Sequence, residues 1–179
     1  MLRITVLSIA SAMGATLFAA FLPLPVEAAV VFAKMQQNGS GACQGALPAF
    51  SGTLRARPLA LQNEGNVTAF ATCSPIYNDQ ASNDEGATAV NLRLVNNGEA
   101  AVDVTCTLVD GTSNPSVEVV YLPEAINLAA GATSSVSWTP LDYPAPQPDR
   151  ILRPNVSCAL PSGVGIAYIS YFFPRQVGE

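Results

Sequence analysis

The sequence contains no histidine and only one lysine, Lys34. Without histidine, the chain cannot assemble a Ser-His-Asp triad, a Cys-His pair or a histidine-based metal site. A serine–lysine pair would depend on Lys34 alone. The catalytic chemistry that stays open needs only carboxylates, as in glycoside hydrolysis.

Charged residues are also scarce, at 12% of the chain, and the formal net charge is −5. Removing residues 1–28 takes away Arg3 and Glu27, one charge of each sign, so the net charge stays at −5. A negative chain repels phosphate backbones and anionic lipid. We therefore expect neither nucleic acid nor a membrane surface as a partner.

Beyond residue 28, no long stretch repeats apolar residues at helical spacing. Short runs of alternating apolar and polar residues occur instead, and turn-forming Gly, Asn and Pro separate them. This pattern is typical of strands that bury one face. The sequence predicts an all-β chain, folded as an antiparallel β-sandwich of about seven to nine strands.

The clearest alternation lies at residues 88–111, in two runs on either side of the turn Asn96-Asn97-Gly98-Glu99. Asn and Gly provide the positive φ that a tight reversal needs. We predict an antiparallel hairpin here. Its inward residues are Val90, Leu92, Leu94, Val102, Val104, Cys106 and Leu108.

Residues 1–28 have the features of a secretory signal peptide. Arg3 forms a positive n-region, residues 4–22 are uncharged, and Val26 and Ala28 fit a cleavage site after Ala28. The alternative is a retained membrane anchor, because an apolar run of about 19 residues can span a bilayer. We expect cleavage and an extracytoplasmic protein, periplasmic or secreted, with no remaining membrane span.

Cleavage leaves about 150 residues, the size of one domain. Residues 29–50 are rich in Gln, Asn, Gly and Ser around Cys43, so we expect a loose N-terminal segment there. Residues 51–179 are expected to form a single β-sandwich domain. Within it, the proline-rich stretch 140–154 should cross the surface in an extended conformation.

All four cysteines follow residue 28. An even number in an exported chain predicts two disulfides, for which three connectivities are possible. A zinc site built from four remote thiolates is the less favoured alternative. The cysteines are Cys43, Cys73, Cys106 and Cys158.

Three carboxylates are candidates for a hydrolase: Asp103 and Glu118, on the polar phases of separate runs, and Asp110, at a turn. We favour solvated strand faces and a turn cap. The acidic loop at 78–85 offers the oxygen ligands that calcium prefers, but it lacks EF-hand spacing. We therefore expect no catalytic residue, no metal and no cofactor.

The last run, Gly165–Phe173, is apolar in both phases. A strand that is apolar on both faces is covered or lies at an interface. Cover could come from the N-terminal segment, the proline crossing, a second copy or a foreign partner. Trp138, by contrast, alternates with Val136 and is expected in the core. The possible interaction surface consists of Tyr168, Tyr171, Phe172 and Phe173.

The segment LRLVNNGEAAVDVTCTLVDG, followed by INLAAGATSSVSW, resembles the strand cadence of bacterial immunoglobulin-like sandwich domains. The segments LRARPLALQNEG and VTCTLVDG are similar to parts of exported bacterial proteins. The resemblance implies an extracytoplasmic, immunoglobulin-like β-sandwich and supplies no activity or site. In an immunoglobulin-like order the strands of Cys106 and Cys158 are neighbours or face each other. That order implies the pairs Cys106–Cys158 and Cys43–Cys73.

These features favour a non-catalytic binding or interaction module with a protein or cell-surface partner, because the usual catalytic side chains are scarce. The alternative is a small carboxylate-based hydrolase or lyase on the same sandwich. The ligand and the oligomeric state do not follow from the sequence.

Overall fold

The computed structural model describes residues 29–75, 86–111 and 118–177. The signal peptide predicted for residues 1–28 and the acidic loop at 78–85 lie outside these ranges, so both stay predictions. In the described ranges, no helix combines the length and the apolar character needed to cross a bilayer.

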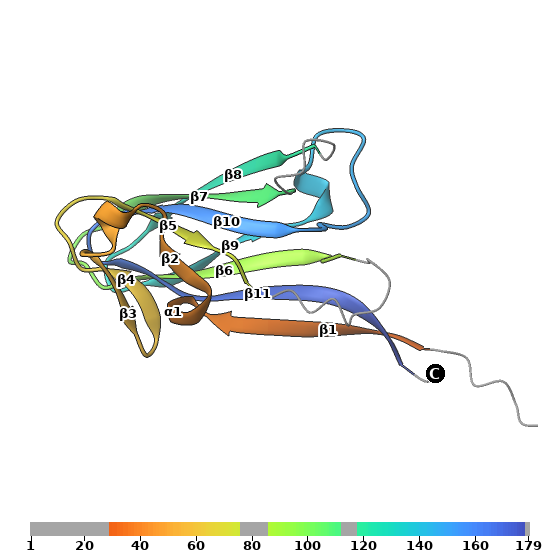
Figure 1. The fold of residues 1–179 in the computed structure, drawn as a ribbon, viewed down its shortest axis with the longest axis horizontal. Helices are drawn as coiled ribbons and strands as arrows, with labels where there is room; N and C mark the ends of the chain where they lie inside the picture. The colour runs from red at the N-terminus through yellow and green to blue at the C-terminus, as the bar shows by residue number, and fades with distance from the viewer. Residues whose placement is uncertain (1–28, 76–85, 112–117, 178–179) are drawn as a thin grey trace, which may run out of the picture.

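Two antiparallel sheets pack face to face as a sandwich (Figure 1), which confirms the predicted all-β, antiparallel sandwich. The described residues form eleven strands, whereas about seven to nine were expected. The six-stranded sheet contains β1 (Ala29–Asn38), β3 (Leu54–Arg57), β4 (Ala60–Asn63), β6 (Ala89–Asn96), β9 (Thr133–Trp138) and β11 (Val164–Val177). The five-stranded sheet contains β2 (Cys43–Gly45), β5 (Ala69–Cys73), β7 (Val102–Asp110), β8 (Val120–Leu128) and β10 (Pro154–Leu160). Short helical turns are α1 (Gly39–Ala42), η1 (Pro48–Phe50) and η2 (Pro140–Asp142).

The strand pairing follows one long hairpin that has been rolled up. Its tip is the β7–β8 pair, and β6 pairs with β9, β5 with β10 and β4 with β11 as one moves away from the tip. Rolling brings β11 beside β6 and β10 beside β7, which closes the two sheets. This connectivity is that of a jelly roll. The resemblance to immunoglobulin-like domains therefore holds for the two-layer antiparallel architecture, whereas the strand order is the jelly-roll order.

The hairpin predicted at residues 88–111 is wrong in its pairing. Both runs are strands, β6 and β7, with the predicted alternation of buried residues. However, β6 pairs with β9 and β11 in one sheet, and β7 pairs with β8 and β10 in the other. The intervening turn carries the chain from one layer to the other. Gly98 is not among the glycines with a positive φ.

The side chain of Asn96 explains how this turn is held. Its amide nitrogen donates to the carbonyls of Ala100, Leu128 and Ala129 at 2.9, 3.0 and 3.1 Å, and its oxygen accepts from the Gly98 N–H at 2.9 Å. Asn96 is fully buried. A buried amide with all these partners fastens the end of β6 to the end of β8, across the two layers.

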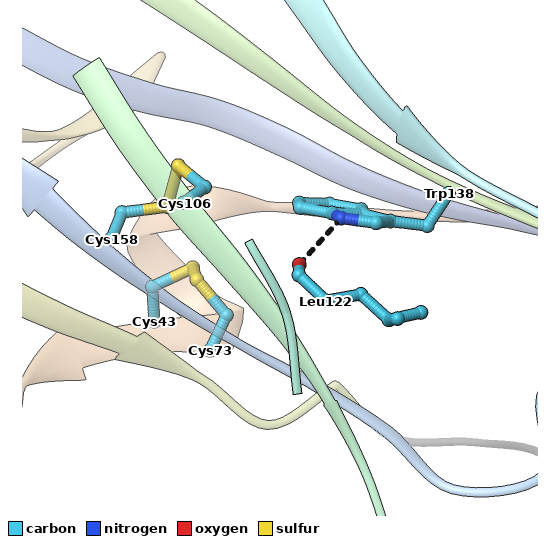
Figure 2. Close-up of a disulfide and its surroundings, with 6 residues drawn as sticks. All are labelled: Cys43, Cys73, Cys106, Leu122, Trp138 and Cys158. Carbon is cyan, nitrogen blue, oxygen red and sulfur yellow. Dashed lines mark hydrogen bonds between the residues drawn. A yellow bond between two sulfur atoms is a disulfide. The ribbon is translucent and has the colours of Figure 1, made fainter. Parts of the chain in front are cut away.

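Trp138 lies in the core, as predicted. It is fully buried, and its indole Nε1 donates to the carbonyl oxygen of Leu122 at 2.9 Å (Figure 2). Because β9 and β8 belong to different sheets, this bond also joins the two layers.

Both disulfides lie within the five-stranded sheet (Figure 2). Cys43 faces Cys73 across β2 and β5, and Cys106 faces Cys158 across β7 and β10. Cα atoms of directly opposed strand residues are close enough for a disulfide, and these distances are 3.9 and 4.1 Å. These are the two pairs that the immunoglobulin-like resemblance implied.

The segment 29–50 is not loose, in contrast to the expectation. Residues 29–38 form β1, which pairs with β11 over ten consecutive positions from Ala29↔Val177 to Asn38↔Tyr168 (Figure 1). Composition suggested a loose segment because the stretch around Cys43 is rich in Gln, Asn, Gly and Ser. The segment is ordered by backbone pairing along β11, and Cys43 then ties it to β5.

Candidate functional site

The two faces of β11 separate the aromatic residues that the sequence grouped together. A bulge between Ile166 and Tyr168 shifts the alternation, so that Ile166, Ile169 and Tyr171 all point into the core. Tyr168 and Phe172 consequently lie on the solvent side of the sheet and are partly exposed. Two residues of the expected interaction surface do not belong to it: Tyr171 is fully buried, and Phe173 packs against the core.

Lys34 stands over the two outward rings. Its Nζ lies 5.6 Å from the centre of the Tyr168 ring and 5.7 Å from that of Phe172. Both distances fall within the range of cation–π attraction. Lys34 reaches this position because it is the partner of Phe172 in the β1–β11 pairing. Ser170, between the rings on the same side of β11, is buried, which is consistent with cover by these side chains.

Polar side chains continue this surface across β6 and β9. Arg93 is the partner of Tyr168 on one side and of Ser135 on the other, and its guanidinium donates to the Ser135 hydroxyl at 3.2 Å. Asn91 lies between Ser170 and Ser137 in the next row. Directly opposed residues share one face of a sheet. We name this surface, centred on Lys34, Arg93, Tyr168 and Phe172, the outer face.

Apolar residues stand at both ends of the outer face. At one end Phe32, two positions before Lys34 and therefore on the same side of β1, is 76% exposed. At the other end lies a shallow hollow of about 460 Å³. The two apolar ends are roughly 23 Å apart. This is the length of an extended strand from Ala167, at the hollow, to Pro174, the partner of Phe32. The hollow is lined by Leu59, Val95, Thr133 and Ala167, among others.

One ion pair lies beside this hollow. The Arg57 guanidinium donates to both carboxylate oxygens of Glu64, at 2.6 and 2.7 Å. These hydrogen bonds hold the pKa of Glu64 below its usual value. No other ion pair within 4.0 Å occurs between residues that the structure describes. No carboxylate of the described residues therefore forms an ion pair with Lys34 or Arg93.

Two of the three candidate carboxylates, Asp110 and Asp103, have structural partners. Asp110 accepts hydrogen bonds from the Tyr143 hydroxyl at 2.7 Å and from the backbone N–H groups of Leu152 and Arg153 at 3.2 and 2.6 Å. It thus fastens both ends of the proline crossing to β7. Burial and this hydrogen bond raise the pKa of Tyr143.

Asp103 accepts from the side-chain amide of Asn127 at 2.7 Å on the surface of β7 and β8. Glu118 is exposed. None of the three carboxylates lines the hollow of the outer face. Among the described residues, no group of three or more His, Cys, Asp or Glu side chains could hold a metal ion.

No known protein family and no curated protein matches the sequence. Among solved structures, the chain is similar to one described as TmCBM61 in complex with β-1,4-galactotriose, at 7% sequence identity and a TM-score of 0.28. That likeness covers 80% of this chain and 88% of the other. At this TM-score, it supports no inference about fold or ligand.

Sequence reasoning found two of the four central residues, Tyr168 and Phe172, and missed Lys34 and Arg93. Arg93 lies on the polar phase of its run, where a charged side chain is expected to face solvent, so nothing in the sequence singled it out. Lys34 lay in the segment expected to be loose. The signal that was present is the alternation of Phe32, Lys34 and Gln36 against Ala33 and Met35, which indicates a strand with one polar–aromatic face.

Proposed function

We propose that this chain is an exported, non-catalytic binding module that holds an extended glycan on its outer face. One observation carries the proposal: two partly exposed rings, Tyr168 and Phe172, stand among hydroxyl, amide and guanidinium side chains on the solvent side of the six-stranded sheet. Rings contribute large apolar contact areas with little loss of conformational entropy.

The polar neighbours suit a ligand rich in hydroxyl groups. Ser135, Ser137 and Asn91 are short side chains that offer both donors and acceptors. Within a row, neighbouring side chains are about 4.8 Å apart across the strands, and successive rows on this face are about 6.6 Å apart along the strands. A chain molecule lying on the face therefore meets several of them in succession. The core of a protein–protein interface, by comparison, is depleted of charged residues.

A binding role also fits the positions of the carboxylates. Asp110 holds the proline crossing, and Asp103 is engaged by Asn127. A hydrolase would need two carboxyl groups flanking one bound substrate. Two disulfides are typical of proteins in oxidising compartments, which supports an extracytoplasmic site of action, periplasmic or secreted.

The test is a glycan-binding screen with neutral and acidic polysaccharides, followed by calorimetry on each that binds. Phe32→Ala removes the most exposed ring of the outer face and should weaken binding about tenfold or more, if this ring contacts the ligand as a hot-spot residue does. Tyr121→Ala is the matched control, because Tyr121 is 65% exposed on β8 in the other sheet.

If Tyr121→Ala lost affinity and Phe32→Ala did not, the binding site would lie on the five-stranded sheet instead. Release of reducing ends from a bound glycan would contradict the non-catalytic role and support the hydrolase instead.

A further inference from the structure

Charge is segregated between the two sheets. Within their strands, the six-stranded sheet carries five basic residues and no acidic one, and the five-stranded sheet carries three acidic residues and no basic one. The net charge of −5 conceals this separation. The basic residues are Lys34, Arg55, Arg57, Arg93 and Arg175. The acidic residues are Asp103, Asp110 and Glu124.

Lys34 and Arg93 are the basic residues of this set that stand at the centre of the outer face. Arg57 is neutralised by Glu64, and Arg55 belongs to the same strand at the edge of the sheet. Arg175 lies on the opposite phase of β11 from Phe172. The centre of the outer face therefore presents two cations with no carboxylate of the described residues within 4.0 Å.

The position of Lys34 distinguishes a neutral from an acidic ligand. Because its ammonium already stands over the Tyr168 and Phe172 rings, a neutral sugar could stack on them only after displacing the cation. An acidic sugar instead meets the cation where it is, and its carboxylate adds a charge-assisted hydrogen bond. The two rings already hold the Lys34 ammonium in position in the free protein, so binding costs less side-chain entropy.

We propose that the ligand of the outer face is an acidic glycan whose carboxylates pair with Lys34 and Arg93 while its sugar rings lie along Phe32 and the hydroxyl-bearing side chains. This inference rests on the proposed function and names the ligand class for the same face. The acidic sheet does not oppose it, because exposed charges more than about 10 Å apart are largely screened at 0.1 M salt. Binding should accordingly weaken as ionic strength rises.

Nucleic acid is the other polyanion to consider, and the structure favours it less. Proteins that bind nucleic acid carry extended basic patches and a strongly basic domain charge, whereas this chain has a net charge of −5. Among the described residues, Lys34 and Arg93 are the cations at the centre of the outer face, and hydroxyl and amide groups surround them.

The experiment compares oligogalacturonate with its fully methyl-esterified form, which keeps the sugar chain and removes the charge. Lys34 is the only lysine, so reductive ¹³C-methylation labels this side chain and the N-terminal amine alone. The labelled Lys34 methyl signal should shift on addition of oligogalacturonate and stay in place with the ester. Affinity should fall about tenfold or more in Lys34→Gln and Arg93→Gln, and it should be largely kept in Lys34→Arg.

Arg153→Gln is the matched control, because it removes the same charge from an exposed position in the proline crossing and should leave the affinity unchanged. Equal binding of the acid and its ester would overturn the acidic ligand and leave the glycan-binding module standing. Failure of every acidic and neutral glycan would overturn both. Binding of a single-stranded oligodeoxynucleotide as tight as that of oligogalacturonate would overturn the glycan class.

Discussion

Tyr171 is fully buried, yet its hydroxyl has no hydrogen-bond partner within the part of the chain that the structure describes. A buried hydroxyl without a partner costs about 1–3 kcal/mol. Burial also raises the pKa of Tyr171, because the charged phenolate is disfavoured in the core. The buried ring of Tyr171 stabilises the fold, and its unpartnered hydroxyl offsets part of that stabilisation.

Tyr171→Phe should therefore keep the ring packing, remove the unpartnered oxygen and raise the free energy of unfolding by about 1 kcal/mol. Urea unfolding at pH 7 measures this change. Tyr143→Phe is the contrasting variant, since the Tyr143 hydroxyl donates to Asp110, and its loss should destabilise the fold. Destabilisation by Tyr171→Phe would mean that the hydroxyl has a partner after all.

The same substitution has a consequence at alkaline pH. A tyrosine whose pKa is raised in the folded state stabilises the fold fully below its unfolded pKa of about 10, and this contribution is lost as the pH rises above that value. The free energy of unfolding of the wild-type protein should fall above about pH 10. Tyr171→Phe should reduce the slope of this fall, because phenylalanine does not ionise.

Among the elements, two turns use the same device. In Asn96-Asn97-Gly98 and in Asn63-Glu64-Gly65, the first asparagine accepts a hydrogen bond from the glycine N–H and donates to distant carbonyls. For Asn63 the distant acceptor is Leu160, and the nearby Val67 carbonyl also accepts, both at 2.8 Å. Each turn carries the chain from the six-stranded sheet to the five-stranded sheet, from β4 to β5 or from β6 to β7.

Asn96→Ala should lower the free energy of unfolding by roughly 2–3 kcal/mol, because it strips buried carbonyls of their donor and the Gly98 N–H of its acceptor. Asn97→Ala is the control on the neighbouring, exposed residue, and it should change stability by less than about 0.5 kcal/mol. Equal effects of the two variants in urea unfolding would show that the turn is held by its backbone rather than by the Asn96 side chain.

These elements also show how far the sequence alone reaches. The alternation of Val90, Leu92 and Leu94 predicted a strand with one buried face, and it is β6. A period of two does not say which strand lies alongside, because two runs that face each other across a core show the same pattern as two runs that pair. The crossing depends on hydrogen bonds from Asn96 to β8, about thirty residues away, and no local pattern reports them.

The candidate site was predictable only in part, for a related reason. Both phases of β11 are apolar, and the bulge after Ile166 decides which rings point outward. A bulge is a property of the pairing and not of the strand sequence. None of the β1 residues is buried, so this strand lacks the buried apolar face by which the other strands were recognised. Lys34 came to Tyr168 and Phe172 through backbone pairing alone.

At the scale of the whole molecule, the two sheets are stabilised in different ways. Both disulfides lie in the five-stranded sheet, and the six-stranded sheet, which carries the outer face, has none in its strands. β1 is held to β11 by ten paired positions. The outer face should therefore keep its geometry when the Cys43–Cys73 bond, which follows β1 in the chain, is removed.

Replacing both members of each pair with alanine tests this division. Chain-entropy estimates for separations of 30 and 52 residues give roughly 3.6 and 4.1 kcal/mol. The Cys106–Cys158 variant should lose more, because both residues are almost wholly buried at the centre of their sheet and alanine leaves a cavity there. Urea unfolding measures both losses. In the Cys43–Cys73 variant, hydrogen exchange should stay slow at those β1 amides that bond to β11, which are every second amide of this edge strand. Fast exchange at these bonded amides would show that the disulfide, and not the strand pairing, holds Lys34 over the aromatic rings.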